Sequence, residues 1–195
     1  MPKTIGRKHT AQQFFDAFEL ARKCGFDNIN TDLIAGLPTD TPESFKNSLD
    51  SIVRLNAECI TVHTLCMKRA SRLTTEGVTL DLQQARDARE MLAYTQNILG
   101  QNEYIPYYMY RQSRMVGNLE NVGWSKRGFE SLYNVYVMDE THTILACGSG
   151  GVTKLKRNNP DYLERIFNFK YPYEYIDRFD ELIQRKSGIM QFYGQ

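Results

Sequence analysis

One stretch of the sequence combines a strand, a sharp break and a helix start, and it limits the folds open to this chain. Residues 28–35 form a strand-like run that breaks at Gly36 and Pro38. Thr41 is then a good helix N-cap, and Pro42 suits the first helical position. A strand, a short loop and a helix in this order are typical of α/β proteins.

A single acidic residue, Asp32, lies in the apolar half of that strand-like run. In α/β proteins, ligands gather at the edge where the parallel strands have their carboxyl ends. A carboxylate near that edge costs free energy unless another group pairs with it. We therefore expect Asp32 to bind a ligand. The alternative is a structural carboxylate held by nearby backbone amides.

The neighbouring segments extend the alternation of helices and strands. A capping box at Thr10 predicts a helix that ends at Gly25. A second helix is expected over residues 42–55 and a second strand over 58–63. This spacing predicts that the two strands are parallel and joined by a helical crossover. A longer helix is expected over residues 82–100.

The character of the sequence changes after residue 100, where aromatic residues become frequent. A strand over residues 104–110 should be interrupted, or lie at a sheet edge, because it contains Pro106. The later elements that we expect are a polar loop (111–130), two strands joined by a turn (132–138 and 143–147), a Gly-rich run (148–151) leading into residues 152–155, and a last helix (173–186).

These elements predict an α/β fold that is incomplete by itself. Two parallel strands with their helices can neither bury both faces of a sheet nor close a barrel. Either the later strands complete the sheet, or neighbouring strands are missing on the N-terminal side. We favour the second alternative, a truncated α/β barrel, with the last βα units in residues 1–100 and a small α+β region in residues 101–195.

The composition argues against several classes of function. Hydrophobic residues make up 42% of the chain and charged residues 24%, which is ordinary for a globular protein. The net charge of +1 gives no reason to expect binding to nucleic acid or to a membrane surface. No apolar run reaches the roughly 20 residues of a membrane span. The first ten residues lack the apolar core of a secretory signal, so we expect a cytoplasmic protein.

The cysteines show no metal-binding pattern. Cys24, Cys59, Cys66 and Cys147 include no Cys-x-x-Cys pair and match no zinc spacing. We expect four reduced thiols, as is usual in the cytosol.

Several motifs, taken in order, resemble those of the oxygen-independent coproporphyrinogen III oxidases, a family of radical S-adenosylmethionine (radical SAM) enzymes. The run Asp32-Leu-Ile-Ala-Gly-Leu-Pro38 is similar to a late barrel segment of these enzymes. Residues 5–10 support the resemblance. So do the Tyr-rich blocks 107–111, 117–121 and 128–136, which are similar to the branch found in Bacillus- and Clostridium-like bacteria.

The cluster motif of this family, Cys-x-x-x-Cys-x-x-Cys, is absent from the sequence. Three thiolates must converge on one [4Fe–4S] cluster, and the four cysteines lie on separate expected elements. The chain therefore looks like the C-terminal part of such an enzyme, whose cluster is ligated by residues absent from this chain. The N-terminal half of the barrel would then be its partner.

The resemblance also implies roles for individual residues. Arg7 matches an arginine that reaches the carboxylate of S-adenosylmethionine, and Asp32 matches a cofactor-binding aspartate. Cys66 stands where a small residue offers its backbone to the cofactor. Gly148–Gly151 and Val152 match a Gly-rich strand end that lies against the cofactor in this family. His63 replaces an aromatic residue that is usual near the cofactor.

Each of these residues also has a plainer interpretation. Arg7 could be a solvated arginine before a helix cap, and His63 a satisfied polar residue at a strand end. Cys66 is better explained as a small buried hydrophobe than as a reactive thiol. The Gly-rich run before Val152 could be an ordinary β-turn.

The substrate that the resemblance implies is a tetrapyrrole with four carboxylates, so cationic side chains should line its pocket. Basic residues of the loops after the strands are the candidates: Arg69, Arg111 and Arg114, with Lys68 and Arg72 nearby. Tyrosines 107, 108 and 110 could flank the ring system, although aromatics that alternate along a strand usually belong to a core. Basic loops are likewise usually just solvated.

The implied reaction of the complete protein is oxidative decarboxylation of two propionates of coproporphyrinogen III to vinyl groups. It begins with reductive cleavage of S-adenosylmethionine, and the isolated chain is expected to be inactive because it cannot hold the cluster. The alternative function is a haem or tetrapyrrole carrier, since relatives of this family resemble haem chaperones. A gene fragment with no function of its own is the third possibility.

Overall fold

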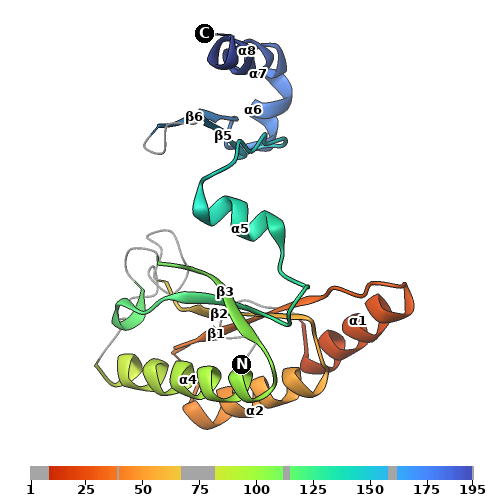
Figure 1. The fold of residues 1–195 in the computed structure, drawn as a ribbon, viewed down its shortest axis with the longest axis vertical. Helices are drawn as coiled ribbons and strands as arrows, with labels where there is room; N and C mark the ends of the chain where they lie inside the picture. The colour runs from red at the N-terminus through yellow and green to blue at the C-terminus, as the bar shows by residue number, and fades with distance from the viewer. Residues whose placement is uncertain (1–8, 39, 67–81, 112–114, 158–161, 195) are drawn as a thin grey trace. The chain divides into compact units, whose positions relative to one another are not determined.

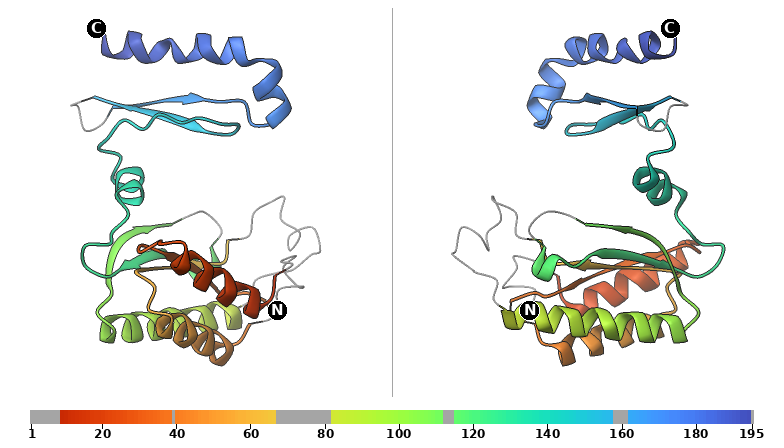
Figure 2. Two further views of the ribbon diagram at one scale, coloured as in Figure 1. Left: turned by 90° about the vertical axis from the view of Figure 1, so that its right-hand side faces the viewer. Right: turned by 60° about the vertical axis from the view of Figure 1, so that its left-hand side comes forward.

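The computed structural model describes residues 9–38, 40–66, 82–111, 115–157 and 162–194. The chain divides into two compact units, one up to Ser131 and the other from Leu132 onward, and each is described by itself (Figures 1 and 2). Among the described residues, no helix is both long enough and apolar enough to cross a lipid bilayer.

The first unit is built on a mixed sheet of four strands in the order β1-β2-β4-β3. The strands are β1 (Asn30–Ala35), β2 (Cys59–Thr64), β3 (Ile105–Tyr110) and β4 (Asn121–Ser125). β1 and β2 are parallel, as predicted, and β4 runs antiparallel to both β2 and β3. β3 lies at an edge of the sheet and its pairing is irregular next to Pro106, which confirms the expectation for this strand.

The helices that accompany this sheet in the described part of the first unit are α1 (Ala11–Lys23), α2 (Pro42–Arg54) and α4 (Leu82–Gln101). A short 3-10 turn, η1 (Val116–Asn118), precedes β4. The predicted capping box is present at the start of α1, where the Thr10 side chain accepts from the backbone N–H of Gln13 and the Gln13 side chain accepts from that of Thr10. α2 is the predicted crossover from β1 to β2, and Thr41 caps it.

The core of the first unit lies between the sheet and the helices α2 and α4, which lie side by side along one face of the sheet (Figure 1). Its fully buried members include Leu49 of α2, Ile60 of β2 and Leu99 of α4. Because side chains alternate along a strand, Cys59, Thr61 and His63 of β2 point to the opposite face. The sheet therefore has one apolar face and one face that carries polar groups.

The described residues of the second unit form a two-stranded antiparallel sheet and several helices. They are α5 (Leu132–Asp139), β5 (Val152–Lys156), β6 (Leu163–Phe167), α6 (Pro172–Asp177), α7 (Phe179–Lys186) and α8 (Gly188–Tyr193). Leu155 of β5 and Leu182 of α7 are its most deeply buried apolar side chains.

Residues 132–138 correct one prediction, because they form the helix α5 and not a strand. The expected partner, residues 143–147, contributes only an isolated bridge between Ile144 and Lys154. The preference of aromatic and β-branched residues for strands reflects packing against a neighbouring strand. Residues 132–138 have no strand partner among the described residues, and their backbone hydrogen bonds are made within a helix.

Two further predictions for the C-terminal part were wrong. The expected polar loop, residues 111–130, contains β4, which looks like a loop because Asn121, Gly123 and Ser125 occupy its polar face. The expected single helix over residues 173–186 is divided into α6 and α7 at Arg178, whose ψ of 32° is not helical. Since β3 and β4 complete the first sheet, the packing divides the chain at residue 131, later than the composition changes.

Candidate functional site

The polar side of the four-stranded sheet gathers the side chains of six residues, which we call the polar face: Asn30, Asp32, Thr61, His63, Tyr108 and Tyr110. Strand register brings them together. Asp32 of β1 pairs with Thr61 of β2, and Thr61 and Tyr108 both pair with Gly123 of β4. The polar face thus draws on three strands that are far apart in the sequence.

Asn30 and Thr61 connect β1 to β3 across this face. The Asn30 amide donates a hydrogen bond to Oδ1 of Asp32 at 2.8 Å, and the Thr61 hydroxyl donates to Oδ1 of Asn30 at 3.0 Å. The same hydroxyl lies 3.2 Å from the hydroxyl of Tyr108. Asn30, Asp32, Thr61 and Tyr108 thus each have a hydrogen-bond partner on this face.

A second chain of contacts runs from Asp32 through His63 to Tyr110. Nε2 of His63 lies 3.7 Å from Oδ2 of Asp32, and Nδ1 lies 3.4 Å from the hydroxyl of Tyr110. The rings of Tyr108 and Tyr110 are nearly parallel, with an interplanar angle of 7°. Both nitrogens of the imidazole therefore face a polar neighbour.

Gly123 makes room for this arrangement. A Cβ atom at that position would lie 1.8 Å from Cε1 of Tyr108, so the ring of Tyr108 occupies the space that any other residue would need. The glycine is required by close approach of a side chain rather than by a turn.

On the polar face, the surroundings favour the ionised form of Asp32 and the neutral forms of Tyr108 and Tyr110. The contact with His63, followed by the hydrogen bond from Asn30, lowers the pKa of Asp32 despite partial burial. Burial raises the pKa of Tyr108 and that of Tyr110. At neutral pH, Asp32 is thus ionised, and its side chain is 60% exposed. It can accept hydrogen bonds from hydroxyl or ammonium groups of a ligand.

A cavity of about 570 Å³ lies along β1 and includes Asp32 and His63 in its wall. Its size is within the range of small-molecule sites. The lining is mixed: polar groups come from His9, Asn30, Asp40 and Ser48, and apolar groups from Phe14, Leu33, Ile34, Leu37 and Phe45. Such a wall suits a ligand with both an apolar ring and several hydroxyl or charged groups.

The other predicted site residues have different positions. Cys66 follows β2, is half-buried, and lies close enough to Tyr110 to contribute to the raised pKa of that tyrosine. Arg111 follows β3 and is exposed, with its guanidinium 3.2 Å from Glu120. Val152 is the first residue of β5 in the second unit. Arg7, Arg69 and Arg114, with Lys68 and Arg72, lie outside the described residues.

The Gly-rich run before Val152 has an anchor that the sequence analysis missed. Gly148 and Gly150 have φ angles of 84° and 72°, which favour glycine. The side-chain amide of Asn168 donates to the carbonyl of Gly148 at 2.7 Å, and its backbone N–H donates to that of Gly151 at 2.9 Å. Nothing in the sequence near Asn168 indicates this role, because the contact spans residues on either side of β5 and β6.

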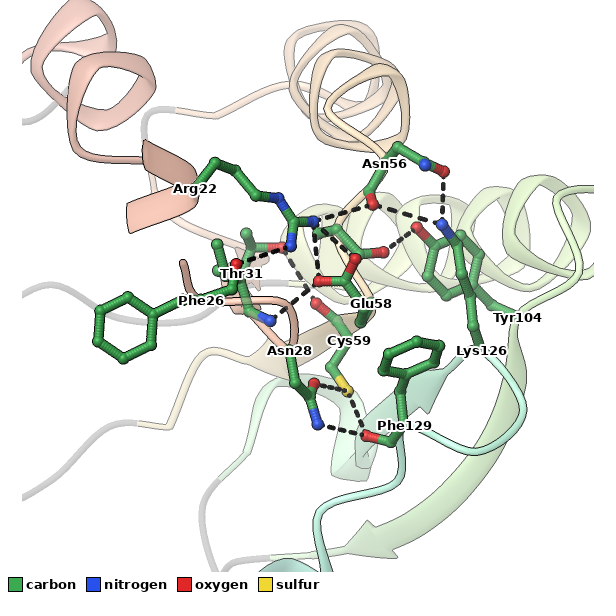
Figure 3. Close-up of polar contacts among 12 residues, drawn as sticks. Arg22, Phe26, Asn28, Thr31, Asn56, Glu58, Cys59, Tyr104, Lys126 and Phe129 are labelled. Atoms are coloured by element: carbon green, nitrogen blue, oxygen red, sulfur yellow. Dashed lines mark hydrogen bonds and ion pairs between the residues drawn. The ribbon is translucent and has the colours of Figure 1, made fainter. Parts of the chain in front are cut away.

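A second polar cluster lies at the end of the sheet where β1 and β2 begin, and its role is structural (Figure 3). The guanidinium of Arg22 donates to both carboxylate oxygens of Glu58 at 2.7 and 2.8 Å, and the backbone N–H of Ile29 donates to Glu58 at 3.0 Å. Burial opposes ionisation of Glu58, but these hydrogen bonds outweigh it and lower its pKa. The Cys59 thiol, whose pKa burial raises, contacts the carbonyl of Phe129 at 3.1 Å.

The cysteines do not provide a cluster site. Across the described parts of the chain, which include all four cysteines, no three His, Cys, Asp or Glu side chains are grouped so that they could hold a metal ion. Cys24 is exposed at the end of α1 and Cys59 is buried in β2. The thiols of this chain therefore do not fit a [4Fe–4S] cluster.

The first unit belongs to the class of α/β proteins: two parallel strands are joined by a helical crossover, and its polar face lies next to a cavity. No protein-family model matches the chain. Its structure matches that of the radical SAM enzyme coproporphyrinogen III oxidase (HemN) from Escherichia coli, with a TM-score of 0.62 and 19% identity over 92% of this chain and 40% of the other. The predicted fold, a partial radical SAM barrel with a further α+β region, is thus confirmed.

Sequence comparison identifies the particular relatives. The chain is 37% identical over 189 residues to the oxygen-independent coproporphyrinogen-III oxidase-like protein HemZ of Bacillus subtilis, covering 97% of this chain and 38% of HemZ. It is 31% identical over 166 residues to the haem chaperone HemW of Lactococcus lactis, covering 80% of this chain and 39% of HemW. The chain is thus a homologue of HemZ and HemW, relatives of the oxygen-independent coproporphyrinogen III oxidases, and it spans about two fifths of the length of these two proteins.

Proposed function

We propose that this chain is the C-terminal part of a radical SAM coproporphyrinogen III dehydrogenase of the cytoplasm, and that its polar face binds the nucleoside portion of S-adenosylmethionine. Asp32 accepts hydrogen bonds from the hydroxyl or ammonium groups of the cofactor. The family resemblance assigns backbone contacts with the cofactor to Cys66 and to Val152, and contact with its carboxylate to Arg7. Arg69, Arg111 and Arg114 are the candidate contacts of the tetrapyrrole carboxylates.

The observation that carries this proposal is the ionisation and the surroundings of Asp32. An exposed carboxylate with a lowered pKa is held by Asn30 and His63 at the wall of a cavity large enough for a nucleoside. Perturbed ionisable groups next to a cavity are frequent at functional sites.

The chain contributes only part of the activity that we propose. S-adenosylmethionine, together with a [4Fe–4S] cluster held by other parts of the complete protein, supplies the oxidising chemistry. The residues of this chain bind and orient the cofactor and limit access of water. Propionate side chains of the tetrapyrrole would be converted to vinyl groups with loss of carbon dioxide.

Binding of S-adenosylhomocysteine, a stable analogue of the cofactor, tests the proposed site. We expect chemical-shift changes at β1 and β2 amides of the 195-residue chain, and we expect Asp32→Ala to weaken binding at least tenfold. Asp27→Ala is the matched control, because Asp27 is an exposed carboxylate outside the polar face. Equal weakening in both variants, or undiminished binding in Asp32→Ala, would contradict the role of Asp32.

The second candidate function is a haem carrier, and its support is the similarity to HemW. Titration of the chain with haem separates the two functions. Stoichiometric, tight uptake of haem that survives Asp32→Ala would favour the carrier. Weak haem binding together with Asp32-dependent binding of S-adenosylhomocysteine would favour the oxidase-type role.

A further inference from the structure

We infer that His63 is a positioning residue that holds Asp32 in place and makes ligand binding at the polar face depend on the protonation of its own ring. The identity of the ligand rests on the proposed function, whereas the coupling between His63 and Asp32 rests on the geometry alone. His63 is at the carboxyl end of β2, and its side chain is 29% exposed.

The partners of the two ring nitrogens select one neutral tautomer. Nε2 lies 3.7 Å from Oδ2 of Asp32, which is an electrostatic contact, and a proton on this nitrogen faces the carboxylate favourably. Nδ1 then has a free lone pair, and the hydroxyl of Tyr110 at 3.4 Å can donate to it. The raised pKa of Tyr110, caused first by burial, keeps that hydroxyl protonated.

A second proton on His63 would change both contacts. Nδ1 would become a donor, so the hydroxyl of Tyr110 would have to turn and accept. The ring would also become a cation beside Asp32, and it would compete with any ammonium or hydroxyl group of a ligand for the carboxylate. Protonation of His63 should therefore weaken ligand binding.

Other titratable groups near His63 come from several elements, and few of them change charge near neutral pH. β1 contributes Asp32, β3 contributes Tyr108 and Tyr110, and the segment after β2 contributes Cys66. The cavity wall adds His9 and Asp40. Of these groups, histidine is the type that ordinarily titrates between pH 5 and 8. His9 is therefore the one competing source of a pH effect, and it needs a control.

Nuclear magnetic resonance of the imidazole groups tests the coupling in the 195-residue chain. We expect Asp32→Asn, a change of similar shape, to lower the titration midpoint of His63 by about half a unit or more, because an anion beside the ring is lost. His142, which contacts Tyr136 and is not a residue of the polar face, serves as the internal reference. Tyr110→Phe should reduce the fraction of His63 with its proton on Nε2. An unchanged His63 midpoint in Asp32→Asn would overturn the inference.

A second experiment measures the affinity of the chain for S-adenosylhomocysteine at pH 6 and at pH 8. We expect affinity to be at least threefold weaker at pH 6 in the wild-type chain and in His9→Gln, but equal at the two pH values in His63→Phe. Binding with no pH dependence in the wild type would contradict the inference. If the ligand fails to bind while the His63 midpoint still responds to Asp32→Asn, the proposed function fails and the positioning of Asp32 by His63 stands.

Discussion

At the scale of single residues, Gly123 shows how one position without a side chain can organise a polar site. The ring of Tyr108 lies where a Cβ of residue 123 would be, with 1.8 Å between the two positions. The hydroxyl of Tyr108 can then reach Thr61 on β2. A glycine inside a strand therefore serves the site as well as the fold.

Gly123→Ala should destabilise the first unit by about 1–3 kcal/mol, because the ring of Tyr108 has to move out of its place. In a Tyr108→Ala background the same change should cost much less, since the steric conflict is absent. Chemical denaturation of the four proteins of this double-mutant cycle measures the coupling. Additive effects would show that Gly123 does not act through Tyr108.

Arg22 and Glu58 form the ion pair at the end of the sheet where β1 and β2 begin. Because it is partly buried, it should contribute more to the free energy of unfolding than an exposed pair does. Arg22→Ala should cost about 2 kcal/mol at pH 7, because Glu58, which is 8% exposed, keeps its charge and loses its main partner. Arg54→Ala is the control, since Arg54 is an exposed arginine of α2, and it should cost only a few tenths of a kcal/mol.

The pH dependence of this effect follows from the lowered pKa of Glu58. A carboxyl whose folded pKa lies below its unfolded value stabilises the fold above about pH 4.5, and this stabilisation disappears as the pH falls through the folded pKa. The stability difference between wild type and Arg22→Ala should therefore shrink toward pH 3. A difference that stays constant from pH 7 to pH 3 would show that the pair contributes no charge-dependent stability.

At the scale of elements, the sequence predicted those whose signals are local. The capping box at Thr10, the N-cap at Thr41 and the apolar periodicity of α4 placed three helices correctly. β4 and α5 were missed because their identity depends on partners. β4 is recognisable only once β2 and β3 pair with it, and α5 is a run of strand-forming residues without a strand partner among the described residues.

Some residues of the candidate site could likewise be predicted from the sequence, and others could not. Asp32 stood out because a carboxylate is unusual in an apolar strand, whereas Asn30, Thr61 and Gly123 have no unusual feature in the sequence. Their place on the polar face follows from the register of β1, β2 and β4, and register is a property of the folded sheet. His63 was noticed only through the family resemblance.

Asn168 allows a test of how β5 and its Gly-rich approach are held. Asn168→Ala removes donation to the carbonyls of Gly148 and Ala146, so we expect hydrogen exchange at β5 amides to become several-fold faster. Asn97→Ala in α4 is the control, because Asn97 bonds only to Gln101 on the helix surface in the described contacts. Unchanged exchange in Asn168→Ala would mean that the glycines hold their conformation without this anchor.

At the scale of the whole molecule, we propose that the chain provides one wall of a cofactor site, and its described residues contain no group of side chains that could hold a metal cluster. It spans 38% of the length of HemZ. The isolated chain should therefore form no 5′-deoxyadenosine from S-adenosylmethionine under anaerobic reduction. Detection of that product above a buffer control would contradict this expectation.

The most direct test of Asp32 as a cofactor ligand uses a chimaera in which this chain replaces the matching segment of Bacillus subtilis HemZ. Its cluster content is confirmed by iron analysis before the assay, and formation of 5′-deoxyadenosine is then measured under reducing, anaerobic conditions. We predict product from the chimaera and from its Asp27→Ala variant, and at least a tenfold loss in Asp32→Ala, equivalent to about 1.4 kcal/mol of binding or activation free energy. The same rate from Asp32→Ala and the unmodified chimaera, at equal cluster content, would contradict the account.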